Sequence, residues 1–121
     1  MSQQQAADPV ERMRRIDTTL SHVWMVRTFL KHCEEAEEDE ELCEVHRALY
    51  DYMHALGGPF QAGDAEAYLK QARKKISKLR KAAELFDEIQ PEVSAHTNFV
   101  MARHSLSAAV AEVAALLEET D

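Results

Sequence analysis

The sequence predicts an all-α protein whose single domain is an antiparallel up-down-up-down four-helix bundle. Glycine and proline, which break helices, occur only three times each in 121 residues, and no run is rich in Val, Ile or Thr. Apolar side chains recur at alternating steps of three and four, the spacing of a helix that buries one face. We expect the domain to span residues 9–121, after a mobile tail of residues 1–8.

The first helix is expected to run from residue 9 to about residue 37. Asp8-Pro9 is a typical start, because an aspartate caps a helix and a proline fits the first helical position. The apolar stripe of this helix comprises Met13, Ile16, Leu20, Val23 and Leu30. Arg27 interrupts the stripe, so we expect it to pair with a buried carboxylate or to reach along the bundle, with ligand binding as the alternative.

The second helix is expected to begin after Asp39, with Glu40 and Glu41 in its first turn, where the helix dipole favours negative charge. Its stripe comprises Leu42, Val45, Leu49, Tyr52 and Leu56. The run Gly57-Gly58-Pro59 predicts the end of this helix, which leaves residues 57–63 as a loop.

Two further helices complete the bundle. Asp64 is expected to cap the third helix, whose stripe comprises Ala65, Leu69, Ala72, Ile76, Leu79, Ala83 and Phe86. Pro91 predicts the next break, because a proline pushes the residue before it out of helical geometry. The stripe of the fourth helix comprises Phe99, Ala102, Leu106, Ala109, Val113 and Leu116. Short connections make consecutive helices antiparallel neighbours.

The composition is that of an acidic protein, with 22 acidic and 14 basic side chains and a formal charge of −8. Such a surface repels a phosphate backbone, so binding to nucleic acid is not expected. The start of the sequence has no signal-peptide pattern, and no apolar stretch approaches the roughly 20 residues of a membrane span. We therefore expect a cytoplasmic protein without a membrane partner, in which both cysteines stay reduced.

The segment from Cys33 to Glu44, CEEAEEDEELCE, holds eight carboxylates around two cysteines. If the first two helices form a hairpin that turns within this segment, Cys33 lies level with Cys43. His46 is then one turn along the same face, and the fourth helix brings His96 near Cys33. Four such side chains would suit a tetrahedral zinc ion. The simpler interpretation is a solvated turn, and a docking surface for a basic partner is a further alternative.

Two pairs satisfy the loose pattern R-x4–6-H, namely Arg27 with His32 and Arg47 with His54. At these positions the chain resembles the HEPN ribonucleases, which are also helical bundles. The resemblance implies that Arg47 steadies the scissile phosphate and that His54 acts as an acid or a base. Ala48 stands where that family usually has a polar residue. Glu-x-x-His, the motif of di-iron bundles, does not occur in the sequence.

Residues 70–81, KQARKKISKLRK, carry seven of the 14 basic side chains. These cations occupy nearly every position off the apolar stripe, and no aromatic residue is interleaved for base stacking. A solvated helix face is therefore expected. Together with the acidic hairpin, this face polarises the charge of the domain and would orient a protein partner or a second copy of the chain.

The segment His22–Leu30 is apolar around most of its circumference, which normally indicates burial on all sides. Trp24, Met25 and Phe29 spread well beyond the stripe that faces the bundle. Because aromatic residues and methionine are enriched at interface centres, we expect a homodimer anchored by these three side chains. The alternative is that the loop at Phe60 or the N-terminal tail covers them.

These observations favour a non-enzymatic adaptor or protein-interaction bundle that self-associates through its first helix, binds an unknown protein partner and needs no cofactor. The alternative is a bundle that binds a metal or a small molecule and that could be catalytic. Its candidate residues are the zinc set described above, together with Arg27, His22 and His54. His22 and His54 lie level with each other in the predicted hairpin.

Overall fold

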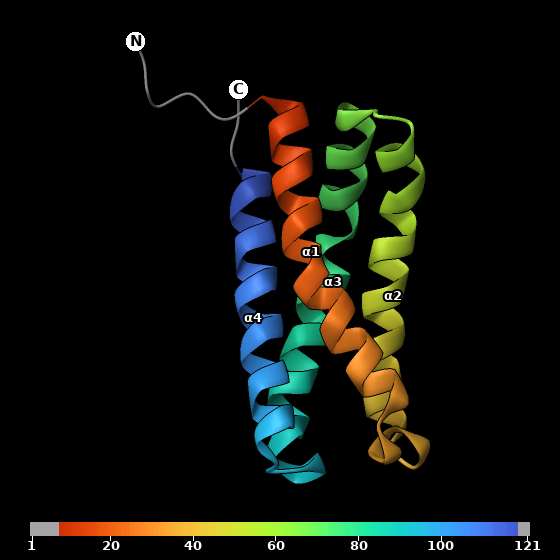
Figure 1. Cartoon of the computed structure of the whole chain (residues 1–121), viewed down its shortest axis with the longest axis vertical. Helices are drawn as coiled ribbons and strands as arrows, with labels where there is room; N and C mark the ends of the chain where they lie inside the picture. The colour runs from red at the N-terminus through yellow and green to blue at the C-terminus, as the bar shows by residue number, and fades with distance from the viewer. Residues whose placement is uncertain (1–7, 119–121) are drawn as a thin grey trace.

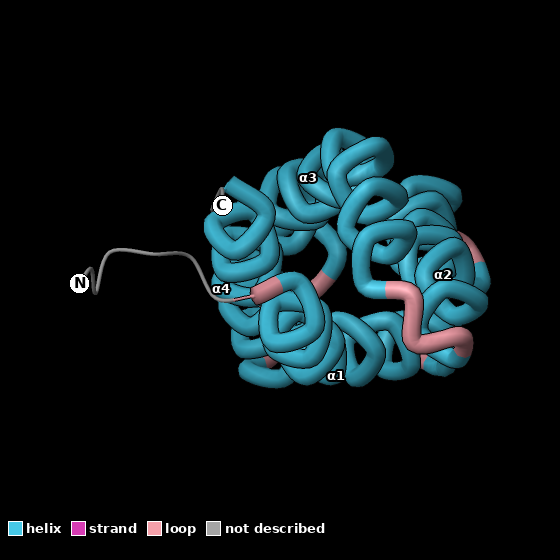
Figure 2. Tube along the Cα trace, turned by 90° about the horizontal axis from the view of Figure 1, so that it is seen from above, coloured by secondary structure: helices cyan, strands magenta, loops and turns pink. Residues whose placement is uncertain are grey.

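The computed structural model describes residues 8–118 and confirms the predicted fold class (Figure 1). The elements are α1 (Pro9–His32), a short 3-10 turn η1 (Glu34–Glu37), α2 (Glu40–Gln61), α3 (Ala65–Val93) and α4 (Thr97–Glu118). No strand occurs within the described range. Successive helices run antiparallel, and a view from above shows α1 between α2 and α4 and across the bundle from α3 (Figure 2). Residues 1–7 of the predicted tail lie outside this range.

Three aspartates cap the helices, as the sequence predicted. The carboxylates of Asp8, Asp39 and Asp64 each accept a hydrogen bond from the backbone N–H three residues further on, at 2.9, 3.0 and 3.0 Å. Each bond satisfies a donor that has no partner inside its helix, and such a cap stabilises a helix by about 1 kcal/mol. The starts of α1, α2 and α3 are therefore determined by local sequence.

The acidic run forms a tight solvated turn between α1 and α2. α1 ends at His32, earlier than the predicted end near residue 37, and Cys33 leaves the helix in an extended conformation. Ala36 is buried within η1, which anchors the turn to the core. Glu37 and Glu38 are exposed, so water can solvate their charges.

The predicted end of α2 at residues 57–59 is wrong, because the helix continues to Gln61. The additional turn places the ring of Phe60 6.1 Å from the ring of Tyr68 on α3, and this contact stabilises it. The chain leaves the helix at Gly63, whose φ of +68° lies in the left-handed region that glycine adopts at little cost.

The predicted break at Pro91 is also wrong, since α3 continues through it to Val93. Gln90 is buried and stays helical, and its Nε2 atom donates a hydrogen bond to the carbonyl of Ser94 at 2.8 Å. The backbone N–H of Ser94 donates to the carbonyl of Gln90 at 3.0 Å. This pair of bonds holds the last turn of α3 together despite the proline.

One core fills the centre of the bundle, and Phe86 and Tyr68 are its largest fully buried side chains. The hydroxyl of Tyr52 donates to the carbonyl of Ala72 at 3.0 Å, and that of Tyr68 donates to a carboxylate oxygen of Asp17 at 3.4 Å. Burial raises the pKa of Asp17, and the bond from Tyr68 offsets part of this rise. Because these side chains fill the centre of the bundle, a ligand can bind only in the surface grooves or on the outer faces.

α4 has the length and composition of a helix that could cross a membrane, contrary to the expectation that no stretch approaches a span. Core helices of soluble proteins have the same properties. Nine side chains of α4 are buried in the bundle, and the helix packs alongside α1 and α3 (Figure 1). In this structure α4 is therefore one of the four helices that form the core.

Candidate functional site

A row of stacked side chains crosses from α1 to α2. The guanidinium carbon of Arg27 lies 4.8 Å from the ring centroid of Trp24 and 4.8 Å from that of Tyr50. Tyr50 stacks in turn on His54, with ring centroids 5.7 Å apart and ring planes inclined by 16°. We refer to Trp24, Arg27, Tyr50 and His54 as the stacked row.

The stacked row explains why an arginine interrupts the apolar stripe of α1. The predicted partner, a buried carboxylate, is wrong, because neither of the ion pairs found between residues 8 and 118 involves Arg27. Two ring faces hold the cation instead, and each such contact is worth about 0.5–1 kcal/mol at a partly exposed site. The same contacts fix the orientation of Tyr50, and the stacking on Tyr50 restrains His54.

His54 also lines a groove between α2 and α3, so it belongs to both features. The groove has a volume of about 480 Å³. Its lining consists of Ala48, Asp51, Tyr52, His54, Ala55, Gln71, Lys75 and Lys78. α2 contributes two alanines, a tyrosine, a carboxylate and an imidazole, whereas α3 contributes an amide and two lysines. Polar groups that converge on one groove are typical of a small-molecule site.

Two lysines make the groove attractive to an anion. Neither Lys75 nor Lys78 takes part in an ion pair within the described part of the chain. Asp51 is the one carboxylate among the described residues of the lining. Both lysines belong to the basic run 70–81, for which we expected a solvated face that would orient a protein partner or a second copy of the chain. The amide and the imidazole of the lining can donate further hydrogen bonds to the same ligand.

The predicted zinc set is not assembled. The Sγ atom of Cys33 donates to the carbonyl of Leu30 at 3.1 Å, and that of Cys43 donates to the carbonyl of Ala36 at 3.0 Å. Burial raises the pKa of the Cys33 thiol, which disfavours the thiolate that a metal needs. From residue 8 to residue 118, no three His, Cys, Asp or Glu side chains are grouped so that they could hold a metal ion.

The two histidines of that set have other environments. His96 lies at the start of α4, where its Nδ1 atom accepts a hydrogen bond from the backbone N–H of Asn98 at 3.0 Å. Partial burial lowers the pKa of His46, and the positive charges of Arg27, Arg47 and Lys31 lower it further. His46 therefore lies in a cationic region, which disfavours a bound metal cation.

The remaining predicted ligand residues do not converge either. His22 is exposed and lines a shallow hollow between α1 and α4, together with Glu112. His54 faces the α2–α3 groove instead. Arg47 lines a hollow at the acidic turn with Glu44, so the HEPN-like pair Arg47 and His54 does not share one hollow.

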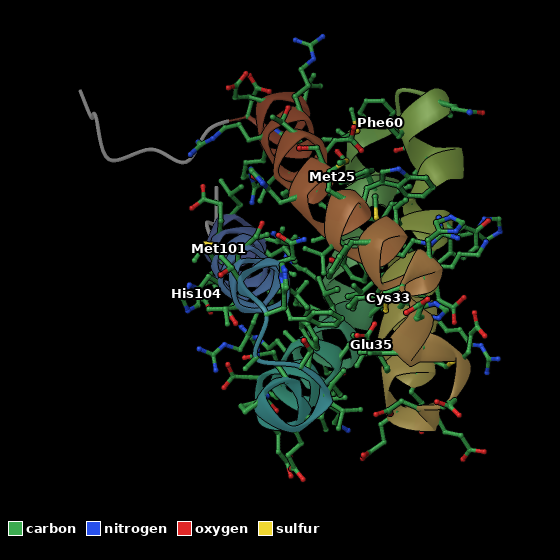
Figure 3. All side chains as sticks on the ribbon, turned by 60° about the horizontal axis from the view of Figure 1, so that its bottom comes forward. Met25, Cys33, Glu35, Phe60, Met101 and His104 are labelled. Atoms are coloured by element: carbon green, nitrogen blue, oxygen red, sulfur yellow. The ribbon has the colours of Figure 1, made fainter. Side chains whose placement is uncertain are left out.

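The three predicted interface residues lie on two sides of α1. Trp24, which is 41% exposed, turns toward Tyr50 of α2, with ring centroids 6.5 Å apart. Met25, which is 66% exposed, and Phe29 line a hollow on the α4 side, next to Met101. Figure 3 shows Met25 on α1 and Met101 on α4. A single partner surface would therefore cover Met25 and Phe29 but not Trp24.

The chain matches the model of a protein family described as Cobalamin adenosyltransferase over residues 4–116. Because the match covers nearly the whole chain, the protein belongs to this family. No curated protein and no solved structure matches the chain.

Family membership corrects the predicted function. The expectation of a non-enzymatic adaptor is wrong, because the family is one of transferase enzymes. The alternative prediction, a bundle that binds a small molecule and could be catalytic, fits the family better. The groove residues Gln71, Lys75 and Lys78 were not predicted as a site, although the basic run 70–81 was a signal that could have indicated them.

Proposed function

We propose that this member of the cobalamin adenosyltransferase family transfers the adenosyl group of ATP to cobalamin, and that the α2–α3 groove holds the ATP. Family membership is the observation that carries the proposal. The groove supports it because Lys75 and Lys78 lie beside small side chains and the imidazole of His54.

The chemistry of adenosyl transfer requires cations near the polyphosphate. The bond between ribose C5′ and the triphosphate oxygen breaks, and the triphosphate leaves with the electron pair of that bond. Its negative charge grows in the transition state, so positive groups held nearby lower the barrier. Lys75 and Lys78 are suited to this role, because both line the groove and neither takes part in an ion pair between residues 8 and 118.

The groove residues of α2 are suited to the nucleoside. Ala48 and Ala55 leave space against the helix backbone, and the ring of His54 is restrained by Tyr50 at 5.7 Å. A restrained imidazole offers a planar surface and one N–H donor at a low entropic cost. Gln71 can pair with a base edge or a ribose hydroxyl through its amide. The cobalt that receives the carbon arrives as part of the substrate.

An activity assay tests this proposal. Since the triphosphate takes the electron pair, cobalt must supply the pair for the new bond, so the assay requires chemically reduced cobalamin. We expect the purified protein to form adenosylcobalamin from reduced cobalamin and ATP, with one triphosphate released per product. Absorbance spectroscopy follows the cobalamin, and phosphorus NMR follows the triphosphate. Absence of ATP-dependent product above the protein-free rate would reject the function.

We also infer a cytoplasmic location for the protein. Cys33 and Cys43 are both free thiols, and each donates its hydrogen to a backbone carbonyl. Free thiols of this kind are usual in a reducing compartment.

We further infer that a second copy of the chain covers the exposed side chains between α1 and α4. Met25 is 66% and Met101 is 54% exposed, and they line one hollow with Phe29. Methionines of this kind are typical of interface centres. We expect Met25→Asp to shift the sedimentation of a dimer to that of a monomer, whereas Ser107→Asp, an exposed position on α4, leaves it unchanged. A wild type that sediments as a monomer at high concentration would contradict this inference.

A further inference from the structure

A second cationic cluster lies outside the groove, on the face shared by α1 and α2. Arg27 and Lys31 are one turn apart on α1, and Tyr50 and His46 are one turn apart on α2. Arg27 contacts Tyr50, so the antiparallel hairpin brings Lys31 level with His46. The charges of Arg27, Arg47 and Lys31 all lower the pKa of His46, so each of them lies near its imidazole.

Arg27 has the features of an oxyanion ligand. Its guanidinium carbon lies 4.8 Å from the ring centroid of Trp24 and 4.8 Å from that of Tyr50, and because those centroids are 6.5 Å apart the two rings adjoin each other on neighbouring sides of the cation. Its Nε atom is buried and has no hydrogen-bond partner in the described part of the chain. Two aromatic contacts restrain the guanidinium, so it loses less freedom when an anion binds to its N–H donors. The rings also shield part of the guanidinium from water, which strengthens charge-assisted bonds to its N–H groups.

No ion pair within the described residues neutralises this cluster. The two ion pairs between residues 8 and 118 join α3 to α4, and neither involves α1 or α2. Arg47 borders the acidic hollow that Glu44 also lines, so part of its charge is offset there. Arg27 and Lys31 therefore take part in no ion pair within residues 8–118, and His46 is a third hydrogen-bonding side chain beside them.

We propose that Arg27, Lys31 and His46 form a binding site for a dianionic phosphoryl group, separate from the α2–α3 groove. The two permanent positive charges match the charge of a phosphate near neutral pH. Three donor side chains from two helices suit the oxygens of a tetrahedral phosphate better than the two of a carboxylate. Trp24 and Tyr50 border the site with partly exposed rings, so the phosphoryl group is either free phosphate or part of an aromatic phosphate ester.

A titration with inorganic phosphate at constant ionic strength tests this site. Trp24 is the single tryptophan of the chain and contacts Arg27, so its fluorescence reports binding directly. The C–H resonances of His46 in proton NMR give a second readout. We expect saturable changes in both signals for the wild type, and an affinity at least about tenfold lower for Lys31→Gln, which removes one charge-assisted contact.

Control variants separate this site from its surroundings and from the proposed activity. Lys74→Gln makes the same charge change at an exposed position of α3, and its Trp24 and His46 signals should titrate like those of the wild type. The same two signals should be unchanged in Lys75→Gln/Lys78→Gln, whose substitutions lie in the groove. The absence of a saturable change in the wild type, or equal affinity in Lys31→Gln, would overturn the proposal. Both readouts are independent of catalysis, so a wild type without transferase activity leaves this result intact.

The same titration with phenyl phosphate identifies the source of the phosphoryl group. If the ring stacks beside Trp24 or Tyr50, phenyl phosphate should bind several-fold more tightly than inorganic phosphate and quench the fluorescence more strongly. Equal affinities would indicate a site for free phosphate. Loss of binding in Lys31→Gln is expected in both cases.

Discussion

Replacing Lys75 and Lys78 together by glutamine is expected to lower kcat/KM for ATP by about 100-fold, the effect of losing charge-assisted contacts that strengthen in the transition state. Both side chains line the α2–α3 groove, and neither has a counterion within residues 8–118. Because the leaving triphosphate gains charge during the reaction, kcat should fall as well as kcat/KM. Initial rates of adenosylcobalamin formation at varied ATP concentrations measure both constants.

Lys74→Gln is the matched control for this experiment. It lies on the same helix, is exposed, and does not line the groove, so it changes the net charge without removing a groove contact. We expect its kinetic constants to stay within twofold of the wild type, the size of a long-range charge effect at physiological ionic strength. If Lys74→Gln loses as much activity as the double variant, the effect is one of net charge, and the groove does not hold the ATP.

Replacing Phe86 by alanine is expected to lower the free energy of unfolding by about 4 kcal/mol, the cost of a large cavity in a well-packed core. Phe86 is 0% exposed, lies on α3 and belongs to the one core that joins all four helices. Urea unfolding followed by far-UV circular dichroism measures the change. This loss is a large part of the 5–15 kcal/mol that stabilises a typical domain.

Lys81→Ala provides the comparison for the core variant. It removes an exposed side chain from the same helix, and we expect a change of less than about 0.5 kcal/mol. An equally small effect of Phe86→Ala would mean that α3 does not pack its stripe into the common core, and the arrangement of helices described above would be wrong.

Local signals in the sequence predicted the fold class and the helix starts. Each of the caps at Asp8, Asp39 and Asp64 joins two residues that are three positions apart, so the local sequence alone specifies it. The apolar stripes predicted the buried faces for the same reason, because helical period and side-chain type are both properties of the chain. The acidic run was predicted as a solvated turn since clustered charges need water.

Helix ends depended on contacts that local signals do not contain. α2 continues past the glycines and Pro59 because Phe60 packs against Tyr68 on the next helix. α3 continues through Pro91 with Gln90 buried and bonded to Ser94. In α2 the contact between two helices outweighs a local preference for ending the helix of a few kcal/mol at most, and in α3 the burial of Gln90 in the bundle does the same.

The candidate site was predicted only in part. The sequence marked His54, Arg27 and the basic run 70–81 as unusual, but it associated the histidine with a metal or a ribonuclease. Side chains that were predicted to be level with one another, such as His22 and His54, lie in different grooves. Sequence spacing specifies the height of a residue along a helix, whereas the rotation of each helix about its axis follows from packing.

The sequence by itself therefore determined that this protein is a four-helix bundle with capped starts and a charged, solvated hairpin turn. Only the tertiary structure decided that Arg27 stacks against the rings of both Trp24 and Tyr50 and that Lys75 shares a groove with His54. The physical reason is the range of the interactions. Capping and amphipathic period act within one helix, whereas a site on a bundle is formed by side chains that meet only after the core has set how the helices face one another.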